Sequence, residues 1–225
     1  MNYLYTFIVT LFLLTNSVAQ TIITDRPDQT ESSSIIEAGS LQIESGCLII
    51  ENHNHGEKNI YLPTTLFRMG LTDIIEFRLM HQFEHKVYEE YSINGFNNLE
   101  CGFKIQLLRK EQTQTELAFL SHIILPTATE LFNDNEFSII NKLCVAHKSN
   151  NNFSFGYNIG YNHHHNETGD FTYSVVFGYA INDKMSAYLE PYGEITGFNE
   201  HLSNINMGVT YLLKDNIQLD YSFGI

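Results

Sequence analysis

A dense group of charged residues lies near the start of the chain, in the sequence TDRPDQTESSS at residues 24–34. Carboxylates and a guanidinium this close together could bind a metal, remain a solvated tail, or fold back and pair with charges elsewhere in the protein. Pro27 fixes its own φ and therefore bends the segment. The residues that could carry this chemistry are Asp25, Arg26, Pro27, Asp28, Gln29, Thr30 and Glu31.

Histidines form a second group whose spacing could serve chemistry, with three in a row at His163, His164 and His165. Neutral imidazole is the commonest side-chain metal ligand, so this run could capture a metal ion. Adjacent side chains do not share a face, however, and no H-E-x-x-H pattern accompanies them. A solvated loop is the favoured interpretation, and we expect neither a metal site nor a cofactor.

The adjacent Ser121 and His122 raise the question of nucleophilic catalysis. Neighbours on a strand point to opposite faces, so this pair cannot act as nucleophile and base. The other strand-borne histidines are His81 and His147, and the sequence has no G-x-S-x-G motif. We therefore expect that the protein is not an enzyme.

The composition limits the partners and the compartment. The chain of 225 residues has 12 Lys and Arg against 26 Asp and Glu, and its net charge of −14 argues against binding to nucleic acid. Residues 1–19 carry no charged side chain, contain a short apolar core and end in a small-x-small site, as a secretory signal peptide does. The alternative is a membrane anchor, which needs about 20 apolar residues and is therefore disfavoured.

The rest of the chain alternates polar and apolar residues with a period of two, which is typical of β-strands. In the stretch FTYSVVFGYAI, Phe171, Tyr173 and Phe177 share one face, and Thr172 and Ser174 share the other. We expect eleven strands, at about residues 40–50, 61–70, 73–83, 97–109, 114–125, 136–147, 152–161, 170–181, 184–192, 203–213 and 216–225.

The connections between these strands are alternately long and short. Short turns such as GLTD and INDK alternate with long polar loops such as NHHHNETG and GEITGFNEH. Outer-membrane barrels have short periplasmic turns and longer external loops. The apolar faces are large and aromatic, and the polar faces carry small residues with isolated charges, which favours an apolar outside and a polar lumen. The expected fold is all-β, a transmembrane antiparallel up-and-down β-barrel of about 12 strands.

In such a barrel the isolated charges on the polar faces would line the lumen. Because both signs are mixed, we favour ion pairs that brace neighbouring strands, with a selectivity lining as the alternative. The charged strip at residues 24–34 would begin at the periplasmic mouth, where it could serve as a plug or lower gate. Arg26 could then pair with a lumen carboxylate, and Asp25, Asp28 or Glu31 with Lys104 or Lys142. The predicted lining residues are Glu44, Glu76, Arg78, Glu100, Lys104, Glu116, Lys142, Glu190 and Asp220.

Eleven strands leave a geometric problem, because antiparallel closure in lipid uses an even number of strands. An open edge in lipid would leave backbone groups unpaired. We therefore expect a twelfth, returning strand after Ile225, so that the barrel at residues 40–225 is incomplete at its C-terminus. A wrong strand count is the alternative.

Two stretches of the sequence resemble a known family. TDRPDQTES at residues 24–32, followed by GSLQIESG at 39–46, is similar to the start of the outer-membrane "transporter" proteins of Bacteroidota in the MetA-pathway phenol-degradation family. YLLKDNIQLDYSFGI at 211–225 resembles that family's penultimate strand. The resemblance implies a leader, a barrel and uptake of aromatic or other hydrophobic compounds.

The sequence therefore predicts an exported protein of the bacterial outer membrane. Residues 1–19 would be the signal peptide, residues 20–39 a periplasmic segment and residues 40–225 the barrel. The expected function is passive diffusion of small, hydrophobic or aromatic compounds. Two alternatives are a closed-lumen barrel that is structural or binds partners at its surface, and a soluble β-barrel that binds a lipophile. The expected partners are outer-membrane lipid, a small-molecule solute and the general barrel-assembly machinery.

Overall fold

The computed structural model describes residues 22–27, 29–52, 56–88, 90–109, 114–132, 136–148, 152–165 and 168–225. The predicted signal peptide and Asp28 lie outside the described residues. Within these residues, no helix combines the length and the hydropathy that a membrane span requires.

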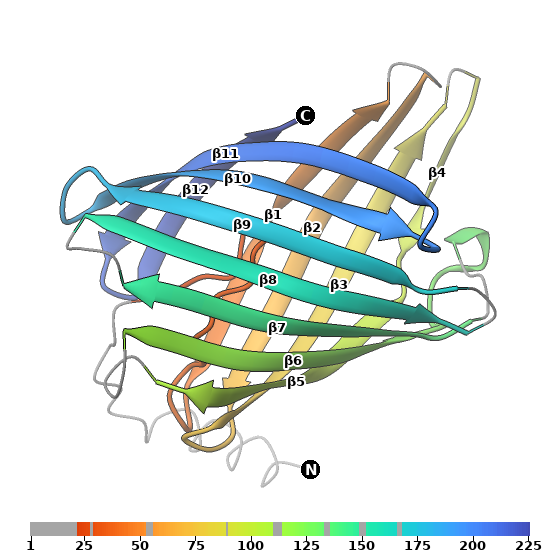
Figure 1. Cartoon of the computed structure of the whole chain (residues 1–225). Helices are drawn as coiled ribbons and strands as arrows, with labels where there is room; N and C mark the ends of the chain where they lie inside the picture. The colour runs from red at the N-terminus through yellow and green to blue at the C-terminus, as the bar shows by residue number, and fades with distance from the viewer. Residues whose placement is uncertain are drawn as a thin grey trace, which may run out of the picture.

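A single antiparallel sheet of twelve strands takes up most of the described chain (Figure 1). Eleven strands follow in chain order, each hydrogen-bonded to the next, and β4 lies off this path and pairs with β3. The elements are β1 (Leu41–Asn52), β2 (Glu57–Gly70), β3 (Ile75–Val87), β4 (Ser92–Phe96), β5 (Leu99–Leu108), β6 (Thr115–Leu125), the 3-10 helix η1 (Glu130–Phe132), β7 (Ser138–Lys148), β8 (Phe153–His164), β9 (Asp170–Ala180), β10 (Met185–Thr196), β11 (Glu200–Lys214) and β12 (Ile217–Gly224).

The path confirms the predicted all-β, up-and-down architecture, and each of its eleven strands overlaps a predicted one. β4 was not predicted, because its five residues lie within a segment that reads as a loop. The ring of Phe96 in β4 stacks on His81 at 4.7 Å and packs edge-on against Phe83 at 5.2 Å. These contacts with β3 hold the short strand to the end of the longer one.

Two predicted loops are shorter than expected. The stretch GEITGFNEH becomes the end of β10, a tight turn at residues 197–199, and the start of β11. Gly197 and Phe198 have φ of 55° and 60° there, and positive φ at two successive residues is what a tight hairpin turn demands. The predicted histidine loop is also wrong in part, because β8 continues to His164.

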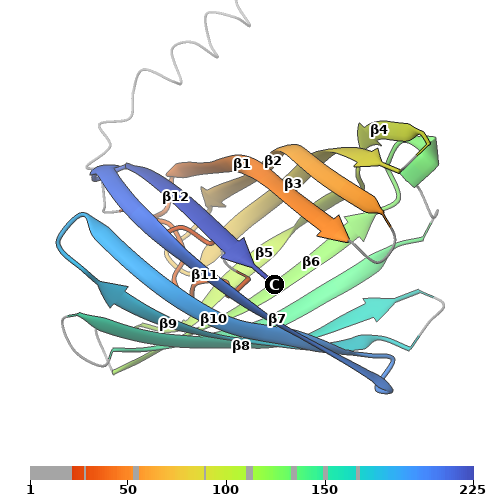
Figure 2. The same ribbon diagram turned by 90° about the horizontal axis from the view of Figure 1, so that it is seen from above.

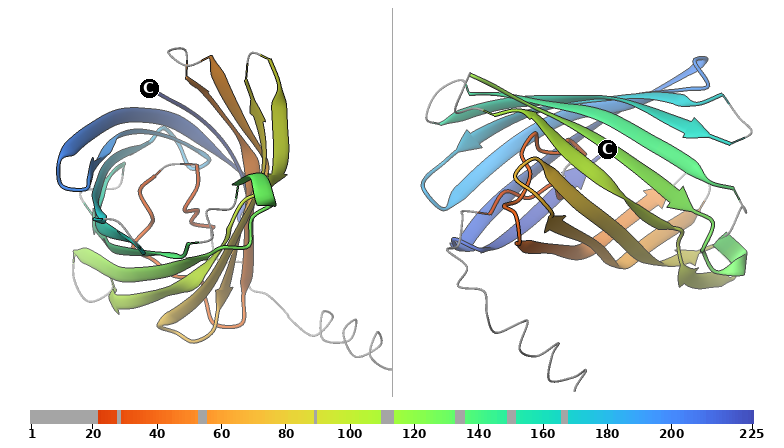
Figure 3. Two further views of the ribbon diagram at one scale, coloured as in Figure 1. Left: turned by 90° about the vertical axis from the view of Figure 1, so that its right-hand side faces the viewer. Right: turned by 90° about the horizontal axis from the view of Figure 1, so that it is seen from below.

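The sheet curls around a central axis and encloses the chain segment that precedes β1 (Figures 2 and 3). β1 and β12 are its two edges, and no hydrogen-bonded pairing joins them among the described residues. Both edges run in the same direction, since every neighbour on the path is antiparallel and the path has eleven strands. The predicted closing strand stays a prediction.

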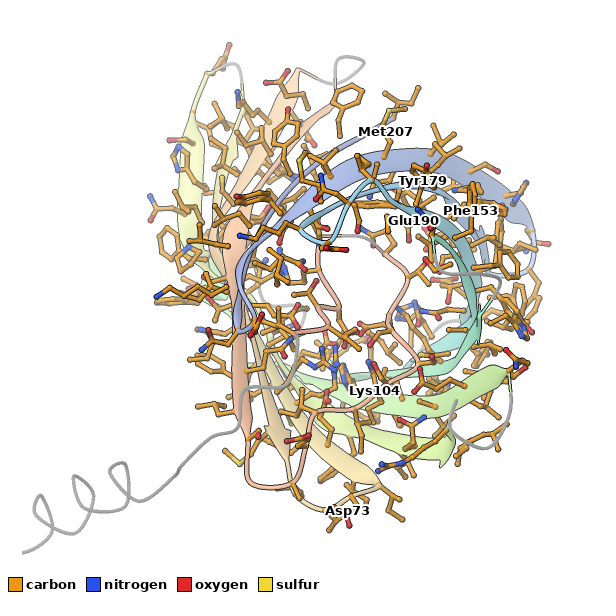
Figure 4. The ribbon with its side chains drawn as sticks, turned by 90° about the vertical axis from the view of Figure 1, so that its left-hand side faces the viewer. Asp73, Lys104, Phe153, Tyr179, Glu190 and Met207 are labelled. Carbon is orange, nitrogen blue, oxygen red and sulfur yellow. The ribbon has the colours of Figure 1, made fainter. Side chains whose placement is uncertain are left out.

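The distribution of side chains is the reverse of a soluble protein, whose interior is apolar. Among the described residues, sixteen polar or charged side chains are buried, against six hydrophobic ones. In Figure 4, Lys104 and Glu190 point into the ring, and Phe153, Tyr179 and Met207 point away from it. The three outward side chains are 53%, 44% and 49% exposed. The wall therefore has an apolar outside and a polar inside, as the strand pattern predicts.

Candidate functional site

The chain passes through the inside of the ring before it enters β1. We call residues 22–27 and 29–40 the internal segment (Figures 3 and 4). It starts at the β11–β12 turn, where Ile22 N donates to Asp215 O at 2.8 Å. It ends beside β2, where Gly39 N donates to Gly70 O at 2.8 Å. Both anchors lie at the end of the barrel that carries the short turns.

Three buried cations of the wall converge on Asp25 of the internal segment. Lys104 Nζ lies 2.6 Å from Asp25 Oδ2, and Arg68 Nη1 lies 3.3 Å from the same oxygen. Arg78 Nη1 also forms an ion pair with this oxygen. Glu31 adds a second segment carboxylate, 2.7 Å from Arg78 Nη2. Charges buried this completely are tolerated only when they are paired.

Two carboxylates of the wall complete what we call the ionic cluster. Glu76 accepts two hydrogen bonds from Arg68, at 2.8 Å from Nε and 3.0 Å from Nη2, and Glu44 lies 3.1 Å from Arg68 Nη1. The wall thus contributes three cations and two carboxylates, a charge of +1. The internal segment contributes Asp25 and Glu31, a charge of −2, and is electrostatically complementary to the wall.

The backbone of the internal segment is bound to the same wall. Lys104 Nζ donates to Ser32 O at 3.0 Å, and Gln106 Nε2 donates to Ser33 O at 3.0 Å. Ile36 N donates to Glu76 Oε2 at 2.9 Å. Side chains of the wall therefore take the place of a strand partner for this irregular stretch.

The opposite wall holds the tip of the internal segment, Gln29 and Thr30. Glu190 on β10 is fully buried and accepts from Gln29 N at 2.9 Å and from Thr30 N at 2.6 Å. The Thr30 hydroxyl lies 2.5 Å from Glu190 Oε1 and 2.8 Å from Ser174 Oγ. Asn206 Nδ2 donates to Glu190 from β11 at 3.2 Å. The donors around this carboxylate are neutral, and most of them come from the segment.

A close approach between backbones lets the internal segment leave the lumen. A Cβ at Gly70 would lie 2.0 Å from Glu37 O, so only glycine fits at this position of β2. The approach lies beside the hydrogen bond from Gly39 N, where the segment turns into β1.

The comparisons with known proteins agree with this geometry. The family model described as "Putative MetA-pathway of phenol degradation" matches residues 24–225. The chain belongs to this family. The fold of this family member is also similar to the crystal structure of the COG4313 outer membrane channel from Pseudomonas putida F1, with a TM-score of 0.66 and 9% identity. The match covers 88% of this chain and 91% of that one. No curated protein matches the sequence significantly.

The predicted lining residues of this family member differ in how they are engaged. Glu100 is bonded to His122 Nδ1, and Glu116 accepts from Ser33 Oγ at 2.8 Å. Lys142 has no ion pair with the internal segment among the described residues, so of the two proposed lysines only Lys104 meets it. Glu44, Glu76, Arg78, Lys104 and Glu190 are buried, Glu100, Glu116 and Lys142 are half-buried, and Asp220 is exposed on β12.

Arg26 is placed differently from its predicted pairing with a carboxylate. Its Nη1 donates to Thr64 Oγ1 at 2.6 Å, and Glu44 and Asp220 lie within electrostatic reach. Gln218 Nε2 donates to Thr24 Oγ1 at 2.9 Å. The start of the TDRPDQTES stretch at residues 24–32 therefore contacts both β2 and β12.

The prediction of the lining missed Arg68, the residue that joins most of the ionic cluster. It lies between Phe67 and Met69, and these apolar neighbours give no sign that a charged residue there faces the lumen. The register carries the signal, because Arg68 is paired directly with Arg78, which was predicted to face the lumen. Directly paired residues on neighbouring strands share a face of the sheet.

The electrostatics of Asp25 favour its charged form. Burial alone would raise the pKa of the carboxyl, but the charges of Arg68, Lys104 and Arg78 outweigh it and hold the pKa well below its usual value of 3.8. The contact that holds the internal segment is therefore an ion pair at neutral pH.

His164 of the histidine run belongs to a row of hydrogen-bonded side chains at the end of the lumen opposite the short turns. His164 Nδ1 lies 3.1 Å from Ser138 Oγ, and His164 Nε2 lies 2.9 Å from Asp170 Oδ2. Gly197 N donates to Asp170 Oδ1 at 2.9 Å. The His165 ring packs on Phe137 instead. Among the described residues, no three His, Cys, Asp or Glu side chains gather as a metal site would require.

Proposed function

We propose that this protein is an outer-membrane channel for small solutes, whose internal segment closes the lumen at the short-turn end. The observation that carries the proposal is the ionic cluster, in which Asp25 of the segment meets Arg68, Arg78 and Lys104 of the wall. A wall that is apolar outside and polar inside suits a lipid bilayer around a water-filled lumen. Transport through it would be passive diffusion, without a cofactor.

The location follows from the same proposal. Residues 1–19 serve as an export signal. Residues 20–39 lie on the periplasmic side and form the plug, and residues 40–225 form the barrel in the outer membrane. The general barrel-assembly machinery would insert the chain, and outer-membrane lipid would surround it. A soluble β-barrel that binds a lipophile is the competing location, and release of the protein by osmotic shock would favour it.

Two lines of support point to different solutes. The family description names phenol degradation, which favours small aromatic or hydrophobic compounds. The buried lining of charged and amide side chains favours polar ones. Liposome swelling with phenol derivatives and with a small uncharged sugar of similar size separates these classes.

The decisive experiment compares the intact chain with a variant that lacks residues 24–34, each reconstituted in planar bilayers. Loss of the plug should raise the single-channel conductance, and a folded barrel by circular dichroism is the control. No permeability to any solute in either protein would instead support a closed-lumen barrel that is structural or binds partners at its surface. Unchanged conductance in a folded, permeable variant would make the segment only a linker.

One arrangement favours a second candidate function, the hydrolysis of an ester. Ser138, His164 and Asp170 are hydrogen-bonded in the order of a nucleophile, a base and an orienting carboxylate. Hydrolysis of p-nitrophenyl butyrate by the folded protein, abolished by Ser138→Ala, would support an enzyme. Equal background rates for both proteins would mean that these hydrogen bonds only hold β7, β8 and β9 together.

A further inference from the structure

A pocket of about 270 Å³ lies inside the barrel, beside the tip of the internal segment. Residues of strands β7 to β11 form its wall, and Gln29 of the segment lines it from the other side. This volume is many times the roughly 10–15 Å³ that a cavity needs to hold one water molecule. The pocket is therefore suited to a small solute.

Two opposite charges line this pocket, Lys142 on β7 and Glu194 on β10. The registers place them in one row, because Lys142 is paired with Gly160, Gly160 with Thr172, and Thr172 with Glu194. Three steps between strands, each of about 4.8 Å, separate the two Cα atoms by roughly 14 Å along the wall. Gly160 and Thr172 add little bulk between the charges.

Neither charge has an ion-pair or hydrogen-bond partner among the described residues, although both are half-buried. The positive charge of Lys142 attracts the carboxylate of Glu100, but that carboxylate is already bonded to His122 Nδ1. The contrast with the ionic cluster is clear, because every cation there touches at least one carboxylate. Partly desolvated charges without partners favour a ligand that supplies the opposite charge.

An unsatisfied acceptor in the same wall is an independent indication of a ligand. Asn162 Oδ1 is buried and has no hydrogen-bond donor among the described residues, and Asn162 lines the pocket. Buried polar atoms are nearly always hydrogen-bonded, and this oxygen is an acceptor for which the described chain provides no donor.

We propose that the pocket binds a small zwitterion of the size of a free amino acid. The ligand carboxylate pairs with Lys142, the ligand ammonium pairs with Glu194, and Asn162 supplies a further acceptor. Ile140 and Tyr192, which also line the pocket, offer an apolar surface to the ligand's side chain. The role of this site in transport rests on the proposed channel function, whereas binding itself does not.

Binding is tested on the full chain folded in detergent micelles, by isothermal titration calorimetry. Leucine is compared with 4-methylpentanoate and 3-methylbutylamine, which each keep the isobutyl group and one of the two charges. Leucine should bind about tenfold or more tightly than either analogue, since each charge-assisted contact is worth at least a factor of this size.

The variants Lys142→Gln and Glu194→Gln should each weaken leucine binding about tenfold or more. Lys184→Gln and Glu37→Gln change exposed charges outside the pocket and should leave it unchanged. The double reversal Lys142→Glu with Glu194→Lys should restore binding that either reversal alone removes, which separates a lost contact from a misfolded barrel.

Liposome swelling with a small uncharged sugar, run on the same preparations, separates this inference from the channel. Permeability to the sugar without leucine binding overturns the zwitterion site and leaves the channel standing. Leucine binding without permeability to any solute keeps the site and removes the channel. Binding of 4-methylpentanoate as tight as that of leucine, unaffected by Glu194→Gln, would identify an anion site and overturn the proposal.

Discussion

The two walls of the lumen hold the internal segment by different chemistry. On the β2–β5 side, Asp25 meets Arg68, Arg78 and Lys104, so that charges of opposite sign face each other. On the β10 side, the carboxylate of Glu190 is held by neutral N–H and O–H donors. The first contact is a cluster that several residues share, and the second depends on one carboxylate.

This difference indicates which contact gives strength and which gives position. The ionic cluster would be left with an excess cation in a buried site if the segment withdrew, which is a large electrostatic cost. Glu190 would lose the donors of Gln29 and Thr30 but keep Asn206. We infer that the cluster sets the affinity of the segment for the wall and that the tip sets its path.

The largest expected effect comes from Asp25→Ala. Removing one partner of a buried ion pair leaves an uncompensated charge, so the free energy of unfolding should fall by about 3–5 kcal/mol. Conductance in planar bilayers should rise in the same variant, because the segment loses its main anchor. Urea unfolding followed by circular dichroism measures the first quantity.

Glu37→Gln is the matched control, because Glu37 is an exposed carboxylate of the same segment. We expect its unfolding free energy to stay within about 0.5 kcal/mol of the parent. Equal stability of the parent and the Asp25→Ala variant would show that the ionic cluster does not anchor the segment.

A smaller effect is expected from Glu190→Gln, which keeps the shape of the side chain and one acceptor oxygen. The loss of charge-assisted hydrogen bonds to Gln29 and Thr30 should cost about 1–3 kcal/mol. Thr30→Val removes one of the same donors and should add little in the double variant, because both changes act on one contact. Fully additive losses would indicate that the two residues stabilise the protein separately.

The smallest effect concerns pH. The pKa of Asp25 is lower in the folded protein than its usual value of 3.8, so its stabilising contribution is complete above that value and is lost as the pH falls further. Asp25 should therefore cause no change in conductance between pH 7 and pH 5, and its own contribution should appear only in stronger acid. Asp25→Asn should abolish the acid step that depends on this group. A rise in conductance of the parent between pH 7 and pH 5 that the Asp25→Asn variant lacks would contradict the assignment.

Most of the fold could be predicted from the sequence, because alternation with a period of two is a local property. The stretch 171–181 predicts β9 from its own residues. β4 could not be predicted, since its five residues are held by packing of Phe96 on His81 and Phe83 of another strand. The tight turn at Gly197 and Phe198 also escaped, because a phenylalanine with positive φ is no sequence signal of a hairpin.

The site could be predicted only in outline. The charged strip at residues 24–34 indicated a segment that folds back, and Lys104 was one of two candidate partners for it. The choice between Lys104 and Lys142 needs the path of the segment, which no local pattern contains. Arg68 was missed because its neighbours are apolar, and Arg26 bonds to Thr64 where a carboxylate was expected. The partners at these positions depend on strands that are distant in the sequence.

The contacts of the internal segment also constrain the order in which the molecule assembles. Arg68 and Glu76 are 8 positions apart and meet across a single hairpin, whereas Gln29 and Glu190 are 161 positions apart. Contacts between distant residues require the closure of long loops and form late. The segment emerges before every strand during synthesis, yet its tip can reach its place only after β10 has joined the sheet. This early part of the chain is therefore fixed later than most of the strands that follow it.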